Sequence, residues 1–177
     1  QIDANENNFI VFHLKGSHFN FINRYPQEFA KFSKPDTYDL IPNYIDSIAY
    51  TDYVLQQIQE YAAKHLNLQA MVYFSDHATI PDKRRSPNFG GFANVRIPLF
   101  TFFADEYISN HPHVYSSLKA NQDKYWTNDL AYELICGILD VKSNHYDEAN
   151  SLTSAQYKYT QAMLKTNLGE LWIKDDK

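Results

Sequence analysis

The sequence contains a single cysteine, Cys136, which excludes an internal disulfide and a cysteine-rich zinc site. It has no excess of positive charge either: 16 Lys and Arg residues stand against 21 Asp and Glu residues, so nothing indicates the basic surface of a nucleic-acid-binding protein. No apolar run approaches the ~20 residues of a transmembrane helix, and we expect no signal peptide among these residues. Because the chain begins at Gln1 rather than Met, we expect it to be a piece of a longer protein.

Apolar and aromatic residues, in contrast, are plentiful. Hydrophobic residues make up 44% of the 177 positions and aromatic residues 16%, which is the composition of a globular protein rather than a disordered chain. The length suits one hydrophobic core, and we find neither an internal repeat nor a low-complexity segment. We therefore predict a single α/β domain over residues 1–177, with a mainly parallel sheet flanked by helices.

The stretch from Met71 to His77 is the most informative in the chain. A run of strand-forming residues ends abruptly in Asp76 and His77. In open α/β sheets ligands bind beyond the carboxyl ends of the strands, and carboxylate and imidazole are both metal ligands. We therefore predict a metal site here. The alternative is that Asp76 caps the next element and His77 is a surface residue.

A second strand is predicted over residues 9–15, and it ends in Gly16-Ser17-His18. An amphipathic helix is predicted from Pro42 to about residue 65, because apolar side chains recur there at helical spacing. Asp52 lies on this apolar stripe, where a carboxylate would need a partner. Strand, helix and strand in this order form a βαβ unit with parallel strands, which would bring His18 to the same sheet edge as Asp76 and His77.

The remaining segments carry less chemistry. The loop of residues 78–94 includes Arg84 and Arg85, whose guanidinium groups suit phosphate or sulfate; the alternative is an ordinary solvated surface. A third strand is predicted over residues 95–103 and a helix over 126–139, with Thr127 or Asn128 as its N-cap. We interpret residues 111–113 as a surface turn, 152–164 as a short helix and 171–173 as a small edge strand.

Short blocks of the sequence resemble, in order, the catalytic domain of bacterial phosphoethanolamine transferases. These are membrane-anchored enzymes of the alkaline phosphatase/sulfatase superfamily. The blocks are Gly16-Ser17-His18 followed by Arg24-Tyr25-Pro26, the long helix from Asn43, Val72 to His77, Arg96-Ile97-Pro98, Tyr125 to Asn128, and Tyr146-Asp147. The resemblance implies an alkaline phosphatase/sulfatase-like fold, of which this chain would be the C-terminal portion.

The resemblance also implies roles for individual residues. Asp76 and His77 would bind a catalytic zinc ion, with one ion expected and a second uncertain. His18 would act in catalysis by contacting the transferred phosphoethanolamine group or a second metal. The family carries a further histidine near the position of Arg84, which implies a single-zinc site with Arg84 and Arg85 binding the anionic substrate directly.

The same resemblance implies the setting of the intact protein. The threonine nucleophile, an acidic metal ligand and the membrane helices would lie upstream, so this piece alone would be inactive. The donor would be a phospholipid and the acceptor a cell-envelope glycolipid or sugar, such as lipopolysaccharide, with no nucleic-acid partner. The protein would reside in the bacterial inner membrane with its catalytic domain facing the periplasm or cell exterior.

Three alternatives stay open. A sulfatase, phosphodiesterase or glycerol-phosphate transferase of the same superfamily would share these residues. A non-catalytic domain that binds anionic glycolipid would explain the missing third histidine. An α/β domain with no chemistry at this position is the third.

Overall fold

A computed structural model describes residues 2–3, 6–82, 91–166 and 169–176. The chain packs as two units: residues 1–68 with 80–84, and residues 69–79 with 85–177. Each unit is described by itself below. Within the described ranges, no helix is both long and apolar enough to span a membrane.

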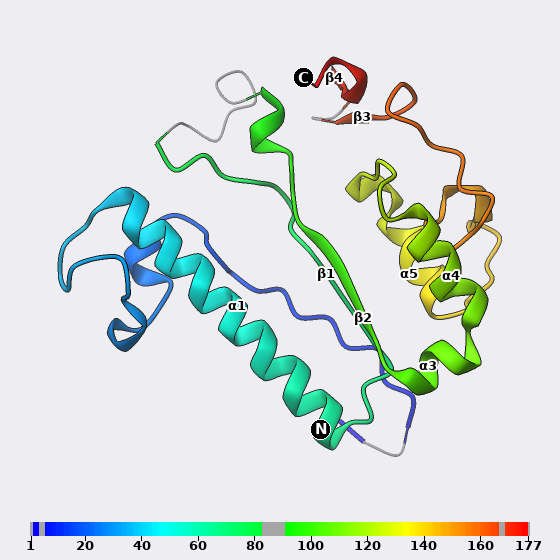
Figure 1. The fold of residues 1–177 in the computed structure, drawn as a ribbon, viewed down its shortest axis with the longest axis horizontal. Helices are drawn as coiled ribbons and strands as arrows, with labels where there is room; N and C mark the ends of the chain where they lie inside the picture. The colour runs from blue at the N-terminus through cyan, green and yellow to red at the C-terminus, as the bar shows by residue number, and fades with distance from the viewer. Residues whose placement is uncertain (1, 4–5, 83–90, 167–168, 177) are drawn as a thin grey trace. The chain divides into compact units, whose positions relative to one another are not determined.

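The first unit is built around the long helix α1, Leu40–His65 (Figure 1). This confirms the helix predicted from the apolar spacing. Lys64 and His65 lie in its last turn, where positive charge favours the carbonyl end of a helix. The fully buried Phe21 packs against the ring of Tyr44 with the ring centroids 5.0 Å apart. The turns that precede α1 are short 3-10 helices, Phe21–Asn23 and Gln27–Phe29.

The strand predicted over residues 9–15 does not form. These residues carry no strand assignment, and the side chains of Phe9, Val11 and Phe12 are 61%, 74% and 57% exposed. Strand-forming residues become a strand only when a neighbouring strand completes their hydrogen bonds, and the described part of the chain offers this segment none. The predicted parallel pairing with residues 70–74 is therefore wrong.

The second unit contains the strand that carries the Asp-His pair. Strand β1, Ala70–Phe74, pairs antiparallel with β2, Leu99–Phe103, in the register Val72 to Thr101 (Figure 1). Both strands were predicted, but their pairing was not. The rings of Tyr73 and Phe100, opposite each other in this register, stack at 4.9 Å.

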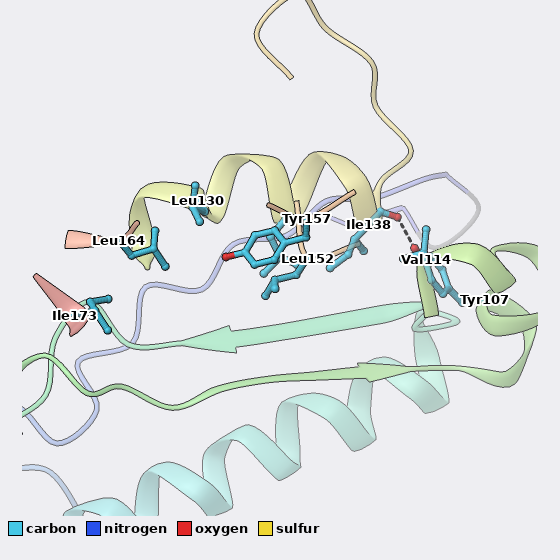
Figure 2. Close-up of a cluster of buried hydrophobic side chains, with 9 residues drawn as sticks. Tyr107, Val114, Leu130, Ile138, Leu152, Tyr157, Leu164 and Ile173 are labelled. Carbon is cyan, nitrogen blue, oxygen red and sulfur yellow. Dashed lines mark hydrogen bonds between the residues drawn. The ribbon is translucent and has the colours of Figure 1, made fainter. Parts of the chain in front are cut away.

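Helices cover one side of this two-stranded sheet. They are α3 (Asp105–Asn110), α4 (Pro112–Asn121) and α5 (Ala131–Ile138), and only α5 was predicted. Of residues 111–113, interpreted as a surface turn, His111 links α3 to α4, and the other two begin α4. The core lies between α5 and the sheet of β1 and β2, as Figure 2 shows. It includes Leu134, which has no exposed surface. The Tyr107 hydroxyl donates to the carbonyl of Ile138 at 2.6 Å within this core.

The C-terminal segment follows the prediction in part. Strand β4, Leu171–Trp172, falls within the predicted edge strand and pairs antiparallel with β3, Lys165–Thr166. The helix predicted over residues 152–164 is wrong, because the segment forms successive turns. Leu152, Tyr157 and Leu164 nevertheless point into the core, which explains why the apolar pattern was present (Figure 2).

Candidate metal centre

The Asp-His pair lies on a tight turn at the end of β1. The Ser75 hydroxyl donates to the carbonyl of His77 at 2.8 Å, and the His77 amide donates to Asp76 Oδ1 at 3.0 Å. The chain leaves the turn with the Ala78 amide bound to the carbonyl of Asn94 at 3.0 Å. These local bonds fix the backbone on both sides of the two candidate ligands.

Asn128 holds the same turn from a distant part of the sequence. Its side-chain amide donates to the carbonyls of Ser75 and Asp76 at 3.1 and 3.2 Å. The neighbouring Trp126 packs edge-on against Phe74, the last residue of β1, at 5.6 Å. The sequence predicted Asn128 only as a possible helix cap. The cap position of the 3-10 turn Asn128–Leu130 is in fact Thr127, which makes no side-chain cap bond.

The ring of His77 is oriented by a backbone carbonyl. Its Nδ1 lies 2.8 Å from the oxygen of Ala78. Because a carbonyl oxygen can only accept, Nδ1 carries the proton, and in the neutral ring the lone pair is on Nε2. An Nδ1–H bonded to a backbone carbonyl is also the usual arrangement of metal-binding histidines.

The two candidate donor atoms lie close together on the surface of the turn. His77 Nε2 is 3.6 Å from Asp76 Oδ2, and the side chains are 35% and 80% exposed. Two ligands of a tetrahedral zinc ion, each at about 2.0–2.1 Å, are separated by about 3.3 Å. The pair therefore fits zinc in both the chemistry and the spacing of its donor atoms.

Two ligands do not complete a zinc site. Across the described ranges, no three His, Cys, Asp or Glu side chains come together in a way that could hold a metal ion. A structural zinc site has four protein ligands and a catalytic one has three. Asp76 and His77 can thus supply only part of a catalytic site.

Burial and the negative charge of Asp76 both affect the pKa of Tyr73 on β1. Burial raises the pKa of the Tyr73 hydroxyl, and the negative charge of Asp76 raises it further. Tyr73 therefore stays protonated at neutral pH.

His18 belongs to the first unit, whereas Asp76 and His77 belong to the second. Its side chain is exposed, with Nδ1 2.5 Å from the carbonyl of Phe19. The preceding Gly16 has a φ of 46°, a left-handed conformation that favours glycine at this turn. Without the parallel strand pairing, the argument that placed His18 beside Asp76 and His77 loses its basis, and their proximity stays a prediction. Arg84 and Arg85 lie outside the described residues.

Comparison with known proteins matches this chain to a family, to a curated enzyme and to solved domains. The sequence model of the family described as Sulfatase matches residues 1–135. The Kdo(2)-lipid A phosphoethanolamine 7''-transferase of Escherichia coli K12 is 26% identical over 138 residues, which is 64% of this chain and 23% of that protein. The crystal structure of the C-terminal periplasmic domain of EcEptC from Escherichia coli matches with a TM-score of 0.66 at 22% identity, over 84% of this chain and 46% of that one.

A second crystal structure of the EcEptC periplasmic domain, a complex with Zn, matches with a TM-score of 0.63 at 20% identity, over 82% of this chain and 45% of that one. The chain thus spans less than a quarter of the curated relative and about half of each solved domain. At this level of identity, the structural likeness shows a shared fold.

Proposed function

Because this chain belongs to the sulfatase family, we propose that the intact protein transfers phosphoethanolamine from a phospholipid to a cell-envelope glycolipid or sugar. The proposal is supported by the similarity to an enzyme named as a phosphoethanolamine transferase of Kdo(2)-lipid A. The observation that carries it is the turn at the end of β1, where Asp76 Oδ2 and His77 Nε2 lie 3.6 Å apart.

Asp76 and His77 would hold a zinc ion, and the similar domain solved as a zinc complex supports this assignment. Bound zinc supplies Lewis-acid stabilisation of a phosphoryl oxygen and lowers the pKa of a hydroxyl nucleophile. The carbonyl of Ala78 fixes the His77 ring, and Asn128 fixes the backbone that carries Asp76, so the ring of one ligand and the main chain of the other are in place before the metal binds.

The transfer would proceed in two displacements at phosphorus. A hydroxyl nucleophile of the intact protein forms a bond to phosphorus, and the diacylglycerol oxygen departs and takes up a proton. A hydroxyl of the acceptor then displaces the enzyme oxygen, which regains its proton. His18 would protonate the leaving oxygen or neutralise phosphoryl charge, and Arg84 and Arg85 would bind the phosphoryl oxygens.

The donor and acceptor place the reaction at a membrane. A phospholipid donor and an envelope glycolipid meet at the inner membrane, and the similar solved domains are described as periplasmic. We accordingly assign the catalytic domain to the periplasmic face of the bacterial inner membrane. The nucleophile would come from a part of the protein outside this chain.

Transfer can be tested with the intact protein, phosphatidylethanolamine and a lipid A-type acceptor, with both lipids followed by mass spectrometry. We expect the acceptor to gain phosphoethanolamine and diacylglycerol to appear in equal amount. Asp76→Ala and His77→Ala should each abolish the gain, whereas Lys64→Gln, an exposed position on α1, should not change it.

The rival functions give different products in the same assay. A phosphodiesterase would release free phosphoethanolamine at the same rate without the acceptor, and a sulfatase would leave both lipids unchanged while cleaving a sulfate ester. A non-catalytic glycolipid-binding domain would bind the acceptor without modifying it. Any of these three results would overturn the transferase proposal.

A further inference from the structure

The first unit contains a pocket of about 170 Å³ that the proposed chemistry does not use. Its walls are the turn of residues 14–16, Asn23 and Arg24, and the side of α1 that carries Tyr50, Thr51 and Val54. One water molecule needs about 10–15 Å³ of such volume, so the pocket has room for a group considerably larger than water. Every wall residue belongs to the first unit.

The wall residues give this pocket a positive charge. Lys15 and Arg24 line it, and no Asp or Glu does. The ion pairs of Lys and Arg side chains in the described ranges are Arg96–Asp176 and Lys158–Asp147, so no carboxylate of that part of the chain forms an ion pair with Lys15 or Arg24. Two cations in the wall of one pocket, without a carboxylate among the other wall residues, favour an anion in that pocket.

A hydrogen bond to the backbone orients the Arg24 side chain. Its Nε donates to the carbonyl of His18 at 2.8 Å, and the side chain is half-buried. This bond uses one of the five N–H groups of the guanidinium and leaves the two terminal nitrogens for a bidentate contact. Lys15 adds an ammonium group to the wall of the same pocket, and this combination of a guanidinium fork and a point charge suits phosphate oxygens.

We propose that the Lys15–Arg24 pocket binds the phosphate group of a phosphate ester. The site assigns a role to Arg24 of the Arg24-Tyr25-Pro26 block, which the transfer chemistry leaves without one. Only the source of the phosphate rests on the proposed function: it belongs either to the phosphodiester head group of the donor or to a phosphorylated sugar of the acceptor. The Arg24 contact to the His18 carbonyl couples the bound anion to the backbone of the residue proposed to act on the leaving oxygen.

The pocket is tested by titrating the intact protein, with its metal removed by a chelator, with glycerophosphoethanolamine and with glucosamine 1-phosphate. Calorimetry or phosphorus NMR gives the dissociation constants. We expect Lys15→Gln and Arg24→Gln each to weaken binding about tenfold or more, because each removes a charge-assisted contact. Lys64→Gln, which removes a charge elsewhere on the same unit, should leave binding unchanged, and added salt should weaken wild-type binding.

The Lys15 side chain makes no hydrogen bond or ion pair within the described residues, so we expect the Lys15→Gln variant to fold normally. A loss of binding in this variant therefore reports on the pocket and not on misfolding. Tighter binding of the diester would identify the donor head group as the source, and tighter binding of the sugar phosphate the acceptor. The proposal is overturned if the wild type binds neither ester, or if both variants bind as the wild type does. Either result would leave the transferase assay intact, since that assay depends on Asp76 and His77.

Discussion

Asp46 on α1 is a fully buried carboxylate whose oxygens are satisfied by one loop. It accepts from the amides of Lys31, Phe32 and Ser33 at 2.9, 3.1 and 2.9 Å, and from the Ser33 hydroxyl at 2.6 Å. Burial by itself would raise the pKa of Asp46, but the hydrogen bonds from Ser33, Lys31 and Phe32 outweigh it and lower the pKa. The carboxylate thus fastens the loop to the helix.

Asp46→Asn should lower the free energy of unfolding by about 2–3 kcal/mol, because an amide replaces an acceptor oxygen among N–H donors. Since the folded pKa is lowered, the stabilisation is present above the ordinary value near 4 and is lost as the pH falls through the folded value. Urea unfolding at pH 7 and pH 3 measures both effects. Asp52→Asn is the matched control on the same helix, and an equal loss in this variant would contradict the assignment.

The sequence indicated Asp52, and not Asp46, as the carboxylate on this helix that would need a partner. Asp52 lies on the apolar stripe in a helical projection, yet it is exposed, whereas Asp46 is buried. The difference depends on the loop of residues 31–33, whose amide groups converge on Asp46. A convergence of backbone donors leaves no trace in the spacing of side chains, so it could not have been predicted.

Asn128 gives a second prediction at the scale of single residues. Asn128→Ala removes both bonds to the Ser75 and Asp76 carbonyls, and we expect zinc affinity to fall about tenfold or more, as is typical when a group that orients metal ligands is lost. Asn150→Ala, in the same unit, is the control. Zinc titration with a competing chelator measures the affinity, and unchanged binding in Asn128→Ala would show that the turn needs no such support.

At the scale of elements, α1, β1, β2, α5 and β4 were predictable because their apolar periodicity matches their structure. Helices α3 and α4 were missed, although Pro112 at the first turn of α4 is a common helix start. The helix predicted over 152–164 fails for a local reason. The hydroxyls of Ser151 and Ser154 accept from the amides of Thr153 and Gln156 and so favour turns over a helix.

Gly137 on α5 fits where no side chain would. A Cβ at this position would overlap Thr153 Oγ1 and approach Ser151 Oγ to 2.9 Å. Gly137→Ala should therefore destabilise the protein by about 1–3 kcal/mol, although alanine is the better helix former. Chemical denaturation measures the change. Adding Thr153→Ala should recover part of the loss, and a stabilising Gly137→Ala would show that α5 does not pack this closely.

At the scale of the whole molecule, the fold is that of the sulfatase-like domains that the sequence resembles, as the structural matches confirm. The sequence did not reveal which segments pair with each other as strands. The predicted order of strand, helix and strand led us to expect a parallel pair of strands. In the structure, β1 instead pairs antiparallel with β2 and not with residues 9–15. Pairing is decided by which segments meet in three dimensions, and periodicity does not report it.

Alkaline pH should destabilise the core of the second unit. Burial, together with the charge of Asp140, raises the pKa of Tyr107 to about 12, and burial raises the pKa of Tyr157 as well. Because these folded pKa values are raised, the stabilisation is full below the ordinary value near 10 and declines as the pH rises toward the folded value. Tyr107→Phe should flatten this decline between pH 9 and pH 11 in urea unfolding; an unchanged slope would contradict it.

The zinc content of the intact protein tests most directly whether Asp76 and His77 bind a metal. Wild-type protein, Asp76→Ala and the control Asp52→Asn would be purified in parallel, exposed to zinc, dialysed and analysed by elemental mass spectrometry. We expect one zinc ion per chain in the wild type and in Asp52→Asn, and a loss of most of this zinc in Asp76→Ala. Equal zinc in all three proteins, or none in the wild type, would contradict the assignment of these residues as metal ligands.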